Sequence, residues 1–174
     1  MDEKELVEKC LGNDKNAQRQ LFDTYSSKMM GVCMRYANTR EEGEDILIEG
    51  FTKIFLHLNE FRFDCMLTTW MRRIMVNTAI SHFRMHHKHH NALPLENAES
   101  ELRSPDELPS ERIQGKELLE LIQRMPETYR VIFNLAVMEG YSHQEIGEML
   151  DIQESTSRSQ LTRARNWLKE RIHR

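Results

Sequence analysis

Near the C-terminal end of the chain, short polar side chains and arginines are grouped at the start of a helix-forming stretch. The members of this group are Ser155, Thr156, Arg158, Ser159, Gln160, Thr162, Arg163 and Arg165. Their hydroxyl, amide and guanidinium groups are the donors and acceptors that read base edges in the major groove or hold backbone phosphates. The pattern therefore indicates DNA recognition rather than catalysis. A solvated helix of an ordinary bundle could carry the same residue types, and the neighbouring elements must decide between the two.

The element before this stretch has the features of a short capped helix. Ser142 and Glu145 have the spacing of a capping box, and Ile146, Met149 and Leu150 supply an apolar face. A break of only a few residues then separates it from the polar helix. Two short helices joined by a tight turn fit a helix-turn-helix, whose second helix enters the major groove.

Charge is unevenly distributed along the chain. The formal net charge is -4, yet residues 153–174 hold six basic and two acidic side chains. A local basic face is sufficient for DNA binding, so the overall acidity does not exclude it. Upstream, residues 68–90 contain no acidic residue, whereas acidic residues cluster over positions 41–49. The acid-free segment could meet nucleic acid, and the acidic one could meet a basic protein partner.

Apolar residues upstream recur at helical spacing, and strand signals are almost absent. One helix is predicted from Leu21 to Tyr36, and a second reaches Leu58 after a capping-box pattern at residues 39–42. A third begins near Thr69 and continues through Phe83. The sequence therefore predicts an all-α fold.

The apolar rhythm lapses over residues 91–111, where three prolines and six acidic residues accompany one arginine. This composition predicts an acidic, flexible linker between two small helical domains at 1–90 and 112–174. A surface loop within one domain would be unusually long at this length. Beyond the linker, one helical pattern ends at Met125. Pro126 suits the first turn of the next helix, and Gly140 suits its C-terminal cap.

Composition excludes several classes of protein. The chain has 174 residues, of which 39% are hydrophobic and 30% charged, as in globular domains. No apolar run approaches the ~18 residues of a membrane span, and the acidic N-terminus lacks a signal core. Three cysteines without a CxxC pattern indicate reduced thiols in the cytoplasm. The histidine cluster at 86–90 has no nearby cysteine or carboxylate to complete a metal site, so a phosphate-facing basic end is expected instead. Neither a metal nor a cofactor is expected.

Five ordered stretches carry a family resemblance. They are Asp45–Phe55, Thr69–Asn77, Met125–Phe133, Gly140–Leu150 and Thr156–Arg165. Together they resemble an extracytoplasmic-function (ECF) sigma factor of bacterial RNA polymerase, over about residues 15–170. The resemblance implies a transcription initiation factor without an enzymatic activity of its own. Its first domain would dock on core polymerase and open the minus-ten promoter element, and its second would read the minus-thirty-five element.

The resemblance also implies partners and site residues. The expected partners are core RNA polymerase, promoter DNA and an anti-sigma factor, with no small-molecule substrate. The expected location is the cytoplasm, or the inner membrane when an anti-sigma factor holds the protein there. The polymerase-binding residues would be Asp45, Ile48, Glu49, Thr52 and Lys53. The minus-ten and melting residues would be Phe61, Phe63, Asp64, Trp70, Arg73, Asn77, Arg84 and Lys88. The group from Ser155 to Arg165 would contact the minus-thirty-five element.

The chain departs from the family pattern at several of these positions. Ile48 replaces a usual glutamine, Gln153 replaces a small helix cap, and Gln160 replaces a frequent arginine. The segment 63–67 replaces a small or polar loop, which affects base preference at the minus-ten element. An alternative is a stand-alone helix-turn-helix transcriptional regulator. That would require a dimer interface or an effector pocket, and the sequence indicates neither.

Overall fold

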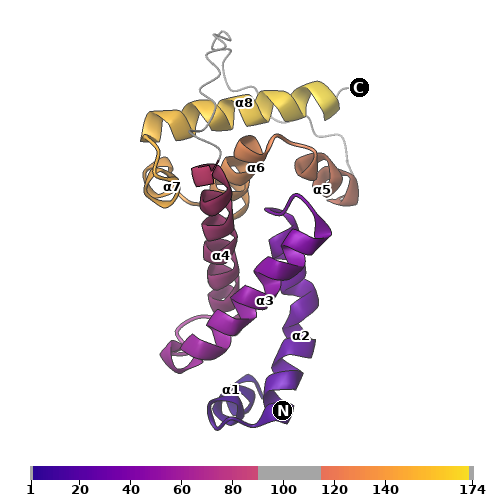
Figure 1. Cartoon of the computed structure of the whole chain (residues 1–174), viewed down its shortest axis with the longest axis vertical. Coiled ribbons are helices and arrows are strands. Elements are labelled where there is room, and N and C mark those ends of the chain that lie inside the picture. The colour runs from indigo at the N-terminus through magenta and orange to yellow at the C-terminus, as the bar shows by residue number, and fades with distance from the viewer. Residues whose placement is uncertain (1, 90–114, 173–174) are drawn as a thin grey trace. The chain divides into compact units, whose positions relative to one another are not determined.

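The structure, a computed structural model, describes residues 2–89 and 115–172 (Figure 1). All regular secondary structure in these residues is helical, which confirms the predicted all-α class. The chain forms two compact units, Met1–Phe83 and Arg84–Arg174. The predicted linker at 91–111 lies outside the described residues, and the predicted domain limits remain a prediction. Among the described residues, no helix combines the length and apolarity needed to cross a membrane.

The first unit is built from four helices and a short 3-10 turn. They are α1 (Glu3–Leu11), α2 (Lys15–Met34), α3 (Arg40–His57), η1 (Leu58–Glu60) and α4 (Leu67–His89), and the boundary between the two units falls within α4. The sequence predicted α2, α3 and α4 but missed α1. This helix has only nine residues and three buried side chains, too few to reveal a period.

Side chains satisfy the free backbone donors at the starts of α2 and α3. Asp14 Oδ1 accepts hydrogen bonds from the amides of Asn16 and Ala17. Thr39 Oγ1 accepts from the amide of Glu42 at 3.1 Å, as the capping-box pattern predicted. The reciprocal bond differs from the expected one, because the Glu42 carboxylate accepts from the amide of Asn38 rather than from that of Thr39. The Glu42 side chain therefore binds the backbone one residue before Thr39, the N-cap of α3.

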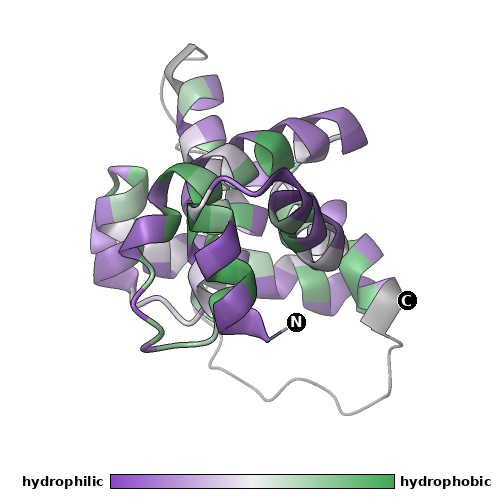
Figure 2. Cartoon of the chain, turned by 90° about the horizontal axis from the view of Figure 1, so that it is seen from below, coloured by the Kyte–Doolittle hydropathy of each residue, from purple (hydrophilic) through white to green (hydrophobic). Residues whose placement is uncertain are grey.

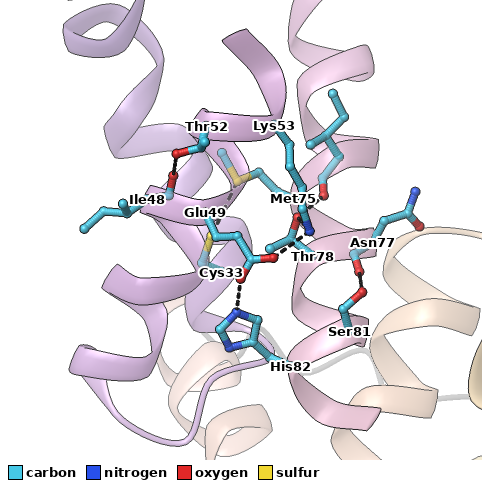
Figure 3. Close-up of polar contacts among 11 residues, drawn as sticks. Cys33, Ile48, Glu49, Thr52, Lys53, Met75, Asn77, Thr78, Ser81 and His82 are labelled. Atoms are coloured by element: carbon cyan, nitrogen blue, oxygen red, sulfur yellow. Dashed lines mark hydrogen bonds and ion pairs between the residues drawn. The ribbon is translucent and has the colours of Figure 1, made fainter. Parts of the chain in front are cut away.

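The core of the first unit depends on close approach at Gly50 of α3. A Cβ atom at this position would overlap the sulfur of Met75 on α4, so only glycine lets Met75 lie against the α3 backbone. On its other side, Met75 Sδ accepts a hydrogen bond from the Cys33 thiol of α2 at 3.9 Å (Figure 3). Burial raises the pKa of Cys33 to about 12, so this thiol stays protonated at neutral pH. Met75 thus joins all three long helices.

The second unit contains α5 (Gly115–Gln123), α6 (Glu127–Phe133), α7 (His143–Leu150) and α8 (Glu154–Ile172). Pro126 is the residue just before α6 rather than a member of its first turn. A π-helical turn over Asn134–Met138, which the sequence did not predict, follows α6. As predicted for a cap, Gly140 closes this segment with φ +79°, and the amide of Tyr141 donates to the carbonyl of Leu135.

A tight turn connects α7 and α8. The predicted capping box at the start of α7 is confirmed, with both the Ser142 and the Glu145 bonds present. The turn itself has Asp151 in the left-handed region at φ 57°, and the amide of Ile152 donates to the carbonyl of Gly147 at 3.0 Å. A Cβ atom at Gly147 would lie 2.8 Å from the carbonyl oxygen of Ile152. Glycine is therefore required for the chain to return this closely.

Hydrophilic and hydrophobic residues form separate stripes along the helices of both units (Figure 2). In the second unit the inward stripe of α8 contains Leu161, Ala164 and Leu168, and that of α7 contains Ile146 and Leu150. These are the apolar positions that the sequence predicted to face inward, except that Met149 is half-buried. The outward stripes are consequently left for other contacts.

We expect Gly147→Ala to destabilise the second unit by about 1–3 kcal/mol, because the new methyl group would force the Ile152 carbonyl away. Hydrogen exchange on the intact chain should then show weaker protection of amides in α7 and α8, with α2 unchanged. Gly31→Ala is the matched control. Within the described chain no atom from outside its own helix lies near this exposed position of α2, so alanine should be neutral or stabilise by about 0.5–1 kcal/mol. Equal effects of the two substitutions would contradict the close approach at Gly147.

Candidate nucleic-acid interface

The leading half of α8 presents one continuous polar stripe. Ser155, Arg158, Ser159, Thr162 and Arg165 are all exposed and recur at intervals of three and four residues, which places them on one side of the helix. The Ser159 and Thr162 hydroxyls donate to backbone carbonyls of their own helix, those of Thr156 and Arg158 respectively. Their oxygen lone pairs therefore remain available to accept hydrogen bonds from outside.

Three of the predicted α8 residues do not lie fully on this stripe. Gln160 is only 8% exposed, and its Oε1 atom finds no hydrogen-bond partner among the described residues. The structure buries Gln160 on the inward face, which it shares with Ser157, Leu161 and Ala164, and its expected contact with DNA stays a prediction. Thr156 and Arg163 are half-buried at its margins.

Asn166 is exposed one turn beyond Thr162 and was missed. Its amide offers both a donor and an acceptor, and its spacing from Ser159 and Thr162 was the available signal.

Arg158 is held by Glu154 one turn earlier, in an ion pair between the guanidinium and the carboxylate. Below it, His143 of α7 lies with Nδ1 2.9 Å from the hydroxyl of Ser157, which ties the two helices together. Burial lowers the pKa of His143, and the positive charge of Arg158 lowers it further, while the negative charge of Glu154 opposes the shift.

A second candidate surface is the loop that joins η1 to α4. Phe61 is buried at 5% exposure and contacts the rings of Phe63 and Trp70, with centroid distances of 4.7 and 5.5 Å. Phe63 is 44% exposed and adopts a left-handed backbone conformation with φ 61°, which is unusual for a bulky residue. Asp64 is exposed beside it. Phe61 thus lies at the base of the cluster and Phe63 is exposed, while the expected contact of Phe61 with DNA stays a prediction.

The outer side of α4 continues this surface as a polar stripe. Arg73, Asn77 and Arg84 are exposed, and Trp70 is half-buried two turns before Asn77. Ser81, which sequence reasoning did not select, lies between Asn77 and Arg84 and donates to the Asn77 carbonyl at 3.0 Å. No acidic residue occurs anywhere in α4. The side chain of Lys88 lies outside the described residues.

The outer side of α3 has a different character. Asp45, Ile48 and Thr52 are exposed at helical spacing, and Leu56, which was not predicted, extends the row. Ile48 and Leu56 have exposed fractions of 62% and 69%, high for large apolar side chains. We call these four residues the α3 ridge. Apolar side chains flanked by polar ones on an exposed helix are typical of a surface that binds another protein.

Two residues predicted to belong to the same surface turn instead toward α4. The Glu49 carboxylate lies 2.6 Å from Lys53 Nζ and 2.6 Å from His82 Nε2, and Lys53 Nζ also donates to Thr78 Oγ1 at 3.3 Å (Figure 3). The bonds from Lys53 and His82 lower the pKa of Glu49 and keep it ionised. The Glu49 side chain stays 44% exposed while it bonds toward α4, and its contact with a partner remains a prediction.

Comparisons with known proteins match two separate parts of the chain. The family described as Sigma-70 region 2 matches residues 21–89, and Sigma-70, region 4 matches residues 115–168. The ECF RNA polymerase sigma-E factor of Haemophilus influenzae is 30% identical over 178 residues, which cover 96% of this chain and 93% of that protein. The RNA polymerase sigma-H factor of Pseudomonas aeruginosa is 29% identical over 173 residues, covering 94% and 90% of the two chains.

Solved structures show the same fold at lower identity. The sigma factor RpoE in complex with the anti-sigma factor NepR from Bartonella quintana matches with a TM-score of 0.52 and 15% identity, over 89% of this chain and 96% of that one. CnrH in complex with the cytosolic domain of CnrY matches with a TM-score of 0.50 and 15% identity, over 97% and 95%. The two sigma-70 regions in order and the 30% identity across nearly the whole length show that this chain belongs to the ECF RNA polymerase sigma factors.

Proposed function

We propose that this protein directs promoter-specific transcription initiation through three separate surfaces. The α3 ridge binds core RNA polymerase, the loop at residues 61–66 with the outer stripe of α4 opens the minus-ten element, and the outer stripe of α8 reads the minus-thirty-five element. The observation that carries the proposal is the exposed ring of Phe63, supported from below by Phe61 and Trp70 beside a helix without acids.

The loop and α4 have the groups that an unpaired base requires. An exposed aromatic ring offers a face on which a base can stack, and such stacking is worth about 1–3 kcal/mol per base. The Asn77 amide can donate to and accept from a base edge, and Arg73 and Arg84 can neutralise phosphates along the same strand. Capture of a base in this way supports strand opening, because a flipped base cannot return to the stack.

The α8 stripe has the groups that duplex DNA requires. Arg158 and Ser159 lie in the first turns of the helix, the part that contacts base edges in helix-turn-helix proteins. Arg165 lies two turns further along and is suited to a phosphate. Arg158 must exchange its carboxylate partner Glu154 for the DNA, which makes the contact conditional on a favourable base.

The remaining parts of the proposal follow from the family. The residues 1–90 act as a region 2-like domain and the residues 112–174 as a region 4-like domain, with 91–111 as their linker. No residue on these surfaces has a catalytic role, and the protein works where polymerase works, in the cytoplasm. The solved relatives bound to NepR and to CnrY support the further proposal that an anti-sigma factor binds this chain as well, at the inner membrane if that partner is anchored there.

Transcription with purified bacterial core polymerase tests the proposal. A DNA library with randomised minus-ten and minus-thirty-five elements is transcribed with and without the protein, and the transcribed molecules are sequenced. We expect a paired motif to be enriched only when the protein is present. Sequence-specific binding by the protein alone, without any transcription, would favour a stand-alone helix-turn-helix regulator.

Replacement of two α3 ridge residues should weaken polymerase binding. We expect Asp45→Arg with Ile48→Ser to cost roughly 2 kcal/mol or more, because both the charge and the apolar contact at the centre of the surface are lost. Binding to core polymerase is measured by fluorescence anisotropy. Asp23→Arg with Leu11→Ser makes the same charge reversal and an equivalent apolar-to-serine change at exposed positions of α2 and α1, and it should leave affinity unchanged. Equal affinity for both double variants would place the polymerase contact elsewhere.

Strand opening should depend on Asn77. We expect Asn77→Ala to form holoenzyme normally, since residue 77 is exposed and away from the α3 ridge, yet to open promoters poorly. Permanganate reactivity of minus-ten thymines measures opening. Ser27→Ala, at an exposed position of α2 outside the proposed surfaces, serves as the control for a small change in an exposed polar side chain. Normal thymine reactivity in Asn77→Ala would show that another residue holds the base.

Arg158 and Arg165 should have separable effects on the minus-thirty-five element. We expect Arg158→Ala to relax preference at one base pair, with a loss of about 1–3 kcal/mol on the preferred sequence. Arg165→Ala should instead weaken binding to all sequences and reduce the salt dependence by about one unit. Selections from the randomised library at two salt concentrations measure both. The opposite assignment of effects would mean that the helix enters the groove in a different orientation.

A further inference from the structure

The helix α1 holds the loop that carries Phe63 from both sides. This loop, residues 61–66, leaves η1 at one end and enters α4 at the other. The helix α1 packs against η1 and against α2 through its buried residues Leu6, Val7 and Cys10. It precedes the residues matched by the region 2 family, so that match assigns it no role.

A single carboxylate of α1 reaches the far end of the loop. Glu3 Oε1 accepts a hydrogen bond from the amide of Leu67, the first residue of α4, at 3.4 Å. Glu3 Oε2 accepts from the hydroxyl of Tyr25 on α2 at 3.1 Å. The second bond orients the carboxylate, because a side chain bound at one oxygen only could rotate away. Burial raises the pKa of Tyr25 first, and its bond to Glu3 raises it further, as expected for a hydroxyl that donates to an anion.

The start of α4 requires this contact for an electrostatic reason. The first amides of a helix have no partner within the helix and concentrate positive potential, which a nearby anion stabilises. The helix α4 has no acidic residue in its first turn, whereas α1, α3 and α5 to α8 each have at least one. Glu3 therefore supplies to α4, from another helix, the negative charge that most of the other helices carry themselves.

The consequence concerns where α4 begins and how its first turn is oriented. Trp70, which contacts Phe61 at the base of the aromatic cluster, lies in the first turn that Glu3 holds. If the Leu67 amide lost its partner, that turn could fray and the support under Phe63 would become mobile. We propose that Glu3 is a positioning residue for minus-ten opening, acting through the Leu67 amide on the loop that presents Phe63. This rests on the proposed role of the loop in base capture.

The test compares four single variants of the full chain as holoenzymes. Glu3→Ala removes both bonds, Glu3→Gln keeps an oxygen that can accept one of them, and Tyr25→Phe removes only the bond that orients the carboxylate. Glu5→Ala is the matched control, because Glu5 lies on the same helix but pairs with Lys9 of α1 itself. A promoter taken from the randomised library, labelled with 2-aminopurine in the minus-ten element, reports the opening rate and its dependence on the minus-ten base.

We expect Glu3→Ala to slow opening by roughly fivefold, the effect of one lost hydrogen bond. We also expect it to reduce discrimination between the preferred and a substituted minus-ten base. Glu3→Gln should recover part of the loss, Tyr25→Phe should show a smaller loss, and Glu5→Ala should behave as wild type. Core affinity should stay unchanged in all four, whereas the thermal unfolding midpoint should fall by about 4–8 °C in Glu3→Ala, because the start of α4 loses its partner. Base discrimination is the decisive measurement. General destabilisation would lower the amount of active protein but would not change the discrimination between minus-ten bases.

Three results would overturn the inference. One is normal opening and discrimination by Glu3→Ala, another is an equal loss in Glu5→Ala, and the last is slower opening accompanied by weaker core binding or by unchanged base discrimination. Failure of the wild-type protein to open any promoter would contradict the proposed function itself, and this outcome is separate from the other three.

Discussion

The first unit depends on one side chain, Met75, lying against a glycine. Because Gly50 has no Cβ, the Met75 sulfur reaches the α3 backbone while it also contacts the Cys33 thiol of α2. Near this contact, Glu49 and Lys53 of α3 bond to His82 and Thr78 of α4. With this side of α3 packed on α4, the α3 ridge is left facing outward. The candidate polymerase surface is therefore the side of α3 that the packing of the first unit leaves exposed.

In the second unit, too, a glycine permits a close contact, here within the turn between α7 and α8. At Gly147 a missing Cβ lets the Ile152 carbonyl approach α7, and the left-handed Asp151 completes the reversal of the chain. The angle of this turn determines which side of α8 packs on α6 and α7. Ser157 and Gln160 lie on the packed side, and Arg158, Ser159 and Thr162 lie on the other. Each candidate interface thus lies on a helix whose packing includes a close contact at a glycine outside that interface.

Acidic residues are unevenly distributed among the helices, which the net charge alone does not show. Acidic side chains lie at the start of most of the helices. The helix α4 has none, and its first amide instead donates to Glu3 of α1. Leaving acids out of α4 keeps its outer stripe attractive to phosphate, but it also removes the local stabilisation of the helix start. An acid placed on a neighbouring helix restores that stabilisation at the start of α4 without adding a negative charge to α4 itself.

The sequence alone determined the helical class, most of the helix positions, the Ser142 capping box and the family. These features depend on local signals, such as the period of the apolar residues, cap residues and short motifs, which can be read within a few turns of chain. It did not determine α1 or the π-helical turn, where nine and five residues are too short for a period to be recognised. It also selected Phe61 and Gln160 for DNA contact, although both side chains are buried, and it did not select the exposed Leu56 and Asn166. The choice between two adjacent residues on a helix or loop is a rotation of about 100° or less. That rotation is decided by contacts with residues distant in the chain, such as Met75 with Gly50, and only the tertiary structure contains them.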